Sequence, residues 1–584
     1  MSQTFVKRFT DLLRDRKLEE VLRLFITEDP KIIDNSMSEI VSVATSYLTE
    51  SNAQYEQELF ECCKTVLVII AEKYNPMETI LEFLGYIEFS NNDTKFCAIL
   101  EPLRICMIKM NEKSKTIEWC FSTIKSYIEE LPMPNSTTDE DAVSDRIMKV
   151  YKHIIWFLEP IIQEAVKINC TLEEGSLLGD YLLSFLISLH GKPFCYINRK
   201  STQKETYKKL VEEMITSTFC LTEDILYFLD IVSKRKKTIQ RQVQDISHIE
   251  SYKRSILFQQ QDNISNLAYA NFYFHVITKK NLWRNVPQVY NPYYILEICM
   301  HFFKILLCKE EEILISNGLT FMESVLKRIL PRSVDTDILE LPIYLDLFKP
   351  LINIMVYCNN EVERKKALHI FQEYIEIFNM RARYSVLSYL YKISEISSGL
   401  MSLITNIFKS SIIECLNSTP QNPQFLGKNL ELMLKKACNL PHGSTTDLVE
   451  ISDEVITTLN LLRFLYIKDK HNETGIWCIT NELKDNYLKP MREGIDLCKT
   501  HWRVKMRDLE QQKKNYTKIH DYNMIKKVDA EVTLTIGGQQ LPVMPLPEKI
   551  SFCHRAINGL DVMESILIRV NECIETGKNY QQEF

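Results

Sequence analysis

Apolar residues recur at three- and four-residue steps through most of the chain, and short polar breaks separate these periodic segments. This spacing is typical of amphipathic helices, because residues three and four apart share one face of a helix. The segments come in pairs that return about every 40 residues, as in HEAT or armadillo repeats. We therefore expect an all-α fold, a helical-repeat solenoid in which stacked pairs bury the faces that no single pair buries alone.

The clearest helix–turn–helix pattern runs from Asp447 to Pro490. Asp447, with Glu450 three residues later, predicts the start of a helix. One face of this helix carries Leu448, Ile451, Val455, Leu459, Leu462 and Tyr466, and its other sides carry Leu461, Phe464, Leu465 and Ile467. A helix that is apolar nearly all round must be covered on more than one side, either by neighbouring helices or by another molecule.

Two stretches of different composition interrupt the helical pattern. Residues 132–142 are acidic and contain prolines, and residues 417–423 read NSTPQNP. Both compositions are typical of linkers. We predict an N-terminal helical body over residues 1–416, with the acidic linker inside it, and a C-terminal domain over residues 424–584.

The segment near the C-terminus departs from the helical pattern. Thr533 and Thr535 alternate with apolar residues, and Gly537-Gly538 supplies a two-residue turn. We expect a small β-hairpin over residues 531–544. A terminal helix over residues 548–576 should follow it and pack as the cap of the solenoid.

Composition narrows the classes of partner. The chain is 45% hydrophobic and 25% charged, with 14 Gly in 584 residues and a net charge of −7. A negative net charge gives no reason to expect nucleic acid as a partner. The N-terminus lacks a signal-peptide core and no run of about 18 apolar residues occurs, so we expect a cytoplasmic protein that contacts no membrane. The basic cluster Lys234–Lys237 is either a nuclear-import signal, which would add a nuclear location, or a solvated helix end or mobile loop, which we favour.

No pattern of catalytic or metal-binding residues stands out. The 11 histidines include no pair at metal-ligand spacing with a third ligand nearby, and the 17 cysteines are scattered without a Cys-x-x-Cys motif. Glycine-rich phosphate loops and the Gly-x-Ser-x-Gly nucleophile motif do not occur. We therefore expect no enzymatic activity, no metal and no cofactor, and we interpret the cysteines as buried reduced thiols.

Aromatic and basic residues after residue 424 stand out from the helical scaffold. They include Tyr466, Trp477 and Tyr487. Trp, Tyr and Arg are enriched at interface hot spots, although each of these aromatic residues taken singly is more readily explained as core. Arg463 interrupts an apolar turn, and it either pairs with a carboxylate such as Glu482 or Asp485 or reaches a partner.

Several segments resemble the glomulin family, in order along nearly the whole chain. The best-matched ones are LNLLRFLYIKD at residues 459–469, TGIW at 474–477, NYLKP at 486–490 and TLTIGG at 533–538. The upstream segments NPMETILEFLGYIE, FLISLHGKPF and ERKKAL agree more loosely. None of these segments is a catalytic signature, so the resemblance indicates a family and not a chemistry.

The resemblance implies a two-part HEAT-like body whose C-terminal domain binds the RING domain of the RING-box subunit of cullin-RING ubiquitin ligases. Such binding covers the surface where a ubiquitin-conjugating enzyme docks, which inhibits the ligase without catalysis. FK506-binding immunophilins are a second partner class associated with the family. The implied partner-binding residues, taken from the best-matched segments, are Arg463, Lys468, Asp469, Trp477 and Lys489. The alternative function is a passive helical-repeat scaffold or adaptor that binds another protein along its concave face.

Overall fold

The computed structural model describes residues 2–88, 92–111, 113–134, 140–168, 173–197, 204–222, 224–226, 264–393, 397–418, 422–518, 535–536, 539–540 and 545–582. Helices form nearly all of the regular structure in these residues, so the predicted all-α class is confirmed. The chain divides into two compact units. The first comprises residues 1–330 and 346–374, and the second comprises residues 331–345 and 375–584.

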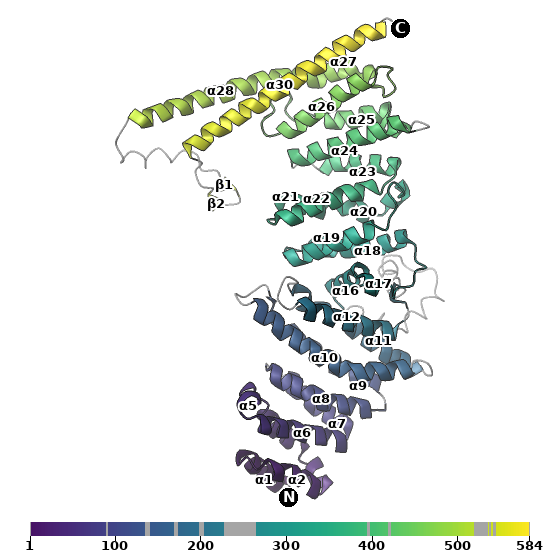
Figure 1. Cartoon of the computed structure of the whole chain (residues 1–584), viewed down its shortest axis with the longest axis vertical. Helices are drawn as coiled ribbons and strands as arrows, with labels where there is room; N and C mark the ends of the chain where they lie inside the picture. The colour runs from purple at the N-terminus through teal and green to yellow at the C-terminus, as the bar shows by residue number, and fades with distance from the viewer. Residues whose placement is uncertain are drawn as a thin grey trace. The chain divides into compact units, whose positions relative to one another are not determined.

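The first unit is a succession of helices (Figure 1). They are α1 (Ser2–Arg14), α2 (Leu18–Thr27), α3 (Pro30–Asp34), α4 (Met37–Ser46), α5 (Glu50–Tyr55), α6 (Gln57–Lys73), α7 (Pro76–Glu88), α8 (Asp93–Lys109), α9 (Lys113–Glu129), α10 (Glu140–Ile168), α11 (Glu173–Ser188), η2 (Phe194–Tyr196), α12 (Lys204–Leu221), α16 (Asn266–Thr278), α17 (Lys280–Trp283), α18 (Pro292–Leu307), α19 (Glu312–Leu326), α21 (Phe348–Tyr357) and α22 (Glu361–Glu376).

Helices of the first unit pack against neighbours one and two places along the chain. For example, α8 packs against α6, α7 and α10, and α10 packs against α11 and α12. This is the pattern expected when helix pairs stack in tandem. The central helix α16 is buried on every side from Leu267 to Ile277. Asparagine–proline pairs start two of these helices, because the Asn75 and Asn291 side chains accept hydrogen bonds from the first-turn amides at 3.1 and 2.9 Å.

In its described residues the second unit contains a further series of helices and two very short strands. They are η4 (Thr336–Glu340), α20 (Pro342–Asp346), α23 (Met380–Ile393), α24 (Ser398–Asn417), η5 (Pro423–Phe425), α25 (Lys428–Ala437), η6 (Gly443–Thr445), α26 (Ser452–Lys468), η7 (Ile476–Ile479), α27 (Thr480–Leu483), the π-helical turn η8 (Lys484–Leu488), α28 (Lys489–Lys518), β1 (Thr535–Ile536), β2 (Gln539–Gln540) and α30 (Leu546–Gln582).

An arginine network around the buried Arg383 lies at the beginning of the second unit. Arg383 is 2% exposed, and its guanidinium lies 3.2 Å from the carboxylates of both Glu376 and Glu414. Arg332 pairs with Glu414 at 2.6 Å, and its backbone amide donates to the carbonyl of Glu376 at 2.9 Å. The one buried charge of this network, the Arg383 guanidinium, thus has two carboxylates beside it, which is the condition under which a charge tolerates burial.

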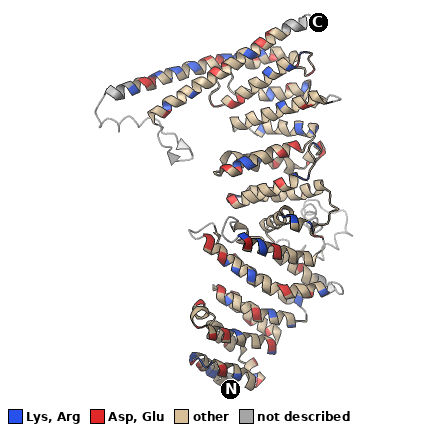
Figure 2. Cartoon of the chain, in the orientation of Figure 1, with Lys and Arg blue, Asp and Glu red and all other residues tan. Residues whose placement is uncertain are grey.

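The other end of the second unit is built from α26, α28 and α30. The long terminal helix α30 packs against both α26 and α28. Lys499 of α28 is 6% exposed, and its ammonium lies 2.5 Å from Asp561 and 2.6 Å from Glu564 of α30. Acidic and basic residues are otherwise interspersed along α28 (Figure 2).

Several sequence predictions fall on residues outside the described ranges. The hairpin predicted at residues 531–544 lies mostly outside them. The four described residues there form one two-residue antiparallel pair, with Thr535 opposite Gln540. A pair of this length does not establish the hairpin. The linker at 417–423 lies within the second unit with residues 419–421 outside the described ranges, so the domain division stays a prediction. The basic cluster at 234–237 also lies outside them.

One described helix, α24, is long and apolar enough to cross a membrane by length and composition, with a mean hydropathy of 1.2. The core helix of a globular unit passes the same test. Leu400, Ile404 and Phe408 of α24 are buried within the second unit.

Candidate functional site

The start of α26 differs from the sequence prediction. The helix begins at Ser452 and not at Asp447, so the predicted capping role of Asp447 is wrong. The Asp447 carboxylate instead accepts a hydrogen bond from the amide of Val449 at 3.0 Å and forms a separate turn. The backbone amide of Glu454, in the first turn of α26, donates to the Ser398 hydroxyl of α24 at 3.2 Å. A neighbouring helix therefore supplies the acceptor that a capping residue usually provides.

The covering of α26 is incomplete. The helix packs against both α24 and α30, and these contacts bury Leu461 and Leu465 together with its main apolar face. Phe464 is only half-buried and Ile467 is 50% exposed. The prediction that this helix is covered on more than one side is therefore confirmed, but two of its apolar residues stay accessible to solvent.

The accessible residues in the C-terminal half of α26 form one strip. They are Asn460, Arg463, Phe464, Ile467 and Lys468, and all five are half-buried or exposed. Their three- and four-residue spacing places them on the same side of the helix. Lys409 of α24 adds a further cation, with its ammonium 5.1 Å from the centre of the Phe464 ring. This surface, which we call the α26 strip, thus has an apolar centre with basic residues beside it.

Arg463 has no acidic partner in the described part of the chain. The two carboxylates considered from the sequence pair elsewhere, Glu482 with Lys435 at 3.0 Å and Asp485 with Lys489 at 2.5 Å. The Nε atom of Arg463 is buried and has no hydrogen-bond partner among the described residues. A buried donor left unsatisfied costs about 1–3 kcal/mol, so the position of Arg463 lowers the stability of the second unit.

Asp469 organises the turn that follows α26. Its side chain is 4% exposed, and its carboxylate accepts hydrogen bonds from the amides of Glu473 at 2.7 Å and Thr474 at 2.8 Å. The Thr474 hydroxyl also donates to this carboxylate. The arrangement indicates a positioning role for Asp469, because its carboxylate is occupied within the chain.

The turn closes against a second loop through two glycines. Gly475 has a φ of 84°, in the left-handed region that favours glycine. A Cβ on Gly475 would lie 3.2 Å from the Cα of Gly427, and the Gly427 amide donates to the Thr474 carbonyl at 2.9 Å. The backbone approach therefore leaves little room for a side chain at Gly475.

Trp477 joins this turn to the terminal helix. Its indole Nε1 donates to the carbonyl of Asp469 at 2.6 Å, and its ring lies edge-on to Tyr466 with centroids 5.0 Å apart. A Cβ on Gly577 of α30 would lie 2.1 Å from Cη2 of Trp477, so the indole occupies the space that glycine leaves open. Trp477 is half-buried, and it holds together elements separated by about 100 residues of sequence.

The two remaining predicted residues are exposed lysines. Lys468 is the last residue of α26 and belongs to the α26 strip. Lys489 is the first residue of α28, after a π-helical turn that buries Tyr487. Among the described residues, no hydrogen bond or ion pair joins Lys489 to the other four predicted residues. Direct partner contact by any of the five stays a prediction.

Sequence reasoning did not single out Phe464, Ile467 or Lys409 as surface residues. The signal for the first two was present, because α26 is apolar on more sides than its neighbours can cover. No pattern in the sequence places Lys409 beside Phe464. In the described ranges, no group of three His, Cys, Asp or Glu side chains is placed to hold a metal ion.

Comparison with known proteins identifies the family that the matching segments of the sequence indicate. A model for an uncharacterised protein family described as YAP/Alf4/glomulin matches residues 6–533. Human glomulin is 25% identical over 568 residues, which covers 95% of this chain and 91% of the relative. Mouse glomulin is 26% identical over 579 residues, covering 96% of this chain and 92% of the relative.

Among solved structures, a circular tandem repeat protein with a novel repeat topology matches 94% of this chain and 95% of its own. The two are 14% identical in sequence with a TM-score of 0.19, which supports no conclusion about the fold.

Proposed function

Because the chain belongs to the YAP/Alf4/glomulin family, we propose that it is a non-catalytic inhibitor of cullin-RING ubiquitin ligases. In this proposal the second unit binds the RING domain of the RING-box subunit and masks the surface where the ubiquitin-conjugating enzyme docks. The body is then a HEAT-like helical repeat that acts only by occupying space. FK506-binding immunophilins are the second partner class in this proposal, without an assigned surface, and we propose a cytoplasmic location.

The α26 strip is the observation that supports this proposal most. Phe464 and Ile467 offer an apolar surface, and Arg463 and Lys468 lie beside it on the same helix. A RING domain presents a small apolar groove with charged rims to its conjugating enzyme, so a surface of this composition is complementary to it. Glu482 and Asp485 pair with lysines, so the charge of Arg463 stays available to an acidic group of the partner.

Masking also sets a requirement on size. A stable interface buries about 1,600 Å² in total, or about 800 Å² on each partner, and five residues of one helix supply only part of this. The strip would then be the centre of the interface, where hot-spot residues gather, and other parts of the second unit would complete it. The turn held by Asp469 and Trp477 directly follows the strip and fixes the end of α26.

Calorimetric titration of the full chain with a RING-box subunit tests this proposal. Wild type should bind one-to-one. Arg463→Glu should weaken binding by at least about 30-fold, because it reverses the charge of a residue that the proposal places against the charged rim of the RING domain. Arg23→Glu in the first unit is the matched control, since Arg23 is an exposed helical arginine in a loose pair with Glu19 at 3.7 Å. No binding by wild type would refute the proposal. An unchanged affinity in folded Arg463→Glu would remove the α26 strip from it.

A further inference from the structure

Two neighbouring cavities lie along α9 and α11 in the first unit. Their volumes are about 420 and 440 Å³, and both are lined by Lys125 and Ser188. The shared residues place the two cavities next to each other, and we call the pair together the α9–α11 groove. Each half is in the size range of sites that hold a small ligand or a few peptide residues.

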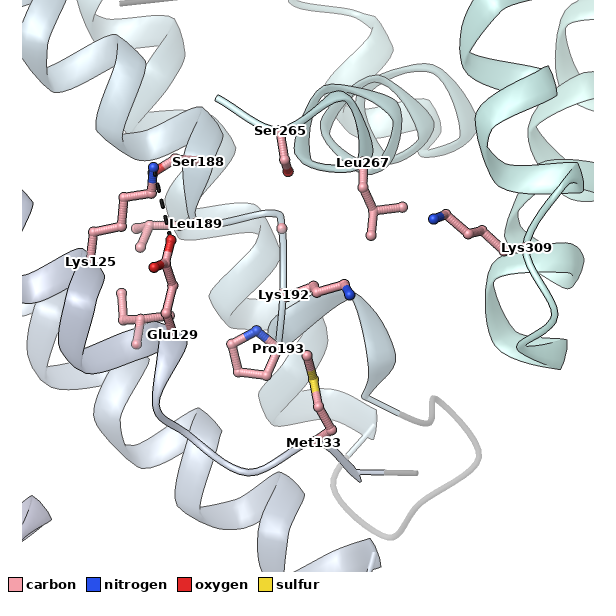
Figure 3. Close-up of a pocket in the computed structure, with 12 residues that line it drawn as sticks. Lys125, Glu129, Met133, Ser188, Leu189, Lys192, Pro193, Ser265, Leu267 and Lys309 are labelled. Atoms are coloured by element: carbon pink, nitrogen blue, oxygen red, sulfur yellow. Dashed lines mark ion pairs between the residues drawn. The ribbon is translucent and has the colours of Figure 1, made fainter. Parts of the chain in front are cut away.

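One half of the groove is basic. Lys192, in the loop after α11, and Lys309, after α18, both extend toward the space beside Leu267 (Figure 3). Both lysines are exposed, and neither forms an ion pair with a described residue. The Lys192 ammonium lies 5.8 Å from the centre of the Tyr196 ring.

Lys125 brings a third ammonium to this half. The one carboxylate that lines this half belongs to Glu129, and its Oε1 lies 4.0 Å from the Lys125 ammonium. Three lysines against one glutamate leave a net charge of +2 on the lining. Glu310 and Glu311 follow Lys309 in sequence but do not line the cavity. An occupant of this half should therefore be anionic.

The other half of the groove is aromatic. Trp119 of α9 is 45% exposed, which is unusual for a residue type that packs well in cores. Tyr181 of α11 donates its hydroxyl to Glu118 at 3.0 Å, so its ring is held at the edge of the groove. Phe121 and Phe185 stack beneath, with ring centroids 4.1 Å apart. An exposed Trp beside a half-buried Tyr on a packed aromatic base is typical of surfaces that bind protein segments.

The length of the groove favours a peptide over a single anion. Along α9 the lining runs from Glu118 to Glu129, which is about 16 Å of helix at 1.5 Å per residue. An extended chain of about five residues has this length. A free phosphate would occupy only the basic half and would leave Trp119 uncovered.

We propose that the α9–α11 groove binds a short extended peptide of a partner protein. An aromatic or aliphatic side chain of the peptide covers Trp119, and acidic side chains lie between Lys192 and Lys309. The lysines are point charges on flexible stems, which suits carboxylates in variable positions. This binding site belongs to the first unit, and it does not depend on ligase inhibition by the second.

Selection from a display library of eight-residue peptides on the full-length protein tests this inference. Enriched peptides should share at least two acidic residues and one aromatic or large aliphatic residue. The most enriched peptide, labelled with fluorescein, should bind at least about tenfold more weakly to the double variant Lys192→Glu, Lys309→Glu, because attraction becomes repulsion at two positions. Trp119→Ala should weaken binding to a similar degree. Conversion of the two lysines to glutamine should give a smaller loss.

Two matched controls make the result specific to the groove. Lys208→Glu with Lys209→Glu makes the same charge change at exposed lysines of α12, outside the groove. Trp156→Ala removes another partly exposed tryptophan of the first unit, in a different cavity. Both should leave peptide affinity unchanged.

Three results would overturn the inference. They are enrichment of peptides without acidic residues, equal weakening by the control variants, and no enrichment at all. Sodium tripolyphosphate serves as the small-anion probe. If it binds in a manner that requires Lys192 and Lys309 while no peptide is enriched, the groove is a site for small anions and not for peptides.

Discussion

Asp469→Ala is expected to loosen the turn after α26 without unfolding the second unit. The carboxylate of Asp469 accepts hydrogen bonds from two backbone amides and one hydroxyl, and its side chain is 4% exposed. Alanine removes the acceptor and leaves the amides of Glu473 and Thr474 without partners. Thr474 is fully buried, so water reaches its amide only if the turn opens.

The size of the effect follows from these bonds. A hydrogen bond to a charged group contributes roughly 1.5–3 kcal/mol, and the two bonds from Thr474 to Asp469 are the buried ones. Relaxation of the turn and entry of water should offset part of this sum, which leaves about 2–3 kcal/mol. Since 1.36 kcal/mol corresponds to a factor of ten, the amides of the turn should exchange about 30- to 150-fold faster.

Hydrogen–deuterium exchange followed by mass spectrometry measures this directly on the peptide that covers residues 469–480. Asp485→Ala is the control, because Asp485 forms an ion pair with the exposed Lys489, away from the turn, and its loss should leave the turn unchanged. Asp469→Ala should also weaken RING-box binding if Asp469 acts by positioning the end of α26. Exchange within threefold of wild type would refute the positioning role.

Two further predictions concern the packing and the titration of the second unit. Gly577→Ala should lower the melting temperature and change tryptophan fluorescence, because the added Cβ would lie 2.1 Å from Trp477. Gly559→Ala is the control: its Cβ meets nothing within 4 Å, so it should raise the melting temperature through helix propensity. Equal gains in both variants would contradict the Trp477 contact. Burial raises the pKa of Glu454 from its ordinary 4.5 to about 7, so the folded state binds this proton more tightly than the unfolded chain does and stability falls as pH rises between these values. Glu454→Gln should remove about 1–2 kcal/mol of that loss, measured as a higher melting temperature at pH 8 than wild type with no gain at pH 4, and an equal gain at both would exclude titration as the cause.

The sequence predicted the kind of structure better than the contacts of individual side chains. Periodicity is a property of each helix alone, so the all-α class and the excess apolar surface of α26 could be read directly. The start of that helix could not, because the acceptor for its first turn is the Ser398 hydroxyl of another helix. Local capping rules assign this role to nearby residues such as Asp447, and here that assignment was wrong.

At the candidate site, too, the sequence indicates which residues are unusual but not what their side chains contact. Arg463 stands out in the sequence because it is a charge in an apolar turn. That Glu482 and Asp485 do not pair with it depends on the fold, which places both carboxylates beside lysines. The best-matched segments predict Asp469 as a contact residue, whereas its carboxylate is directed inward by two amides that return to it through the turn. Trp477 and Gly577 meet across about 100 residues, and no pattern in one chain links two such positions.

The rate of ubiquitin-chain formation by a reconstituted cullin-RING core tests the central claim most directly. The full-length protein should inhibit at a one-to-one ratio to the RING-box subunit without being consumed, and a higher concentration of the conjugating enzyme should restore the rate, because both compete for one surface. Arg463→Glu should need a correspondingly higher concentration to inhibit. An unchanged rate in the presence of excess folded protein would contradict masking and favour a scaffold that binds other proteins.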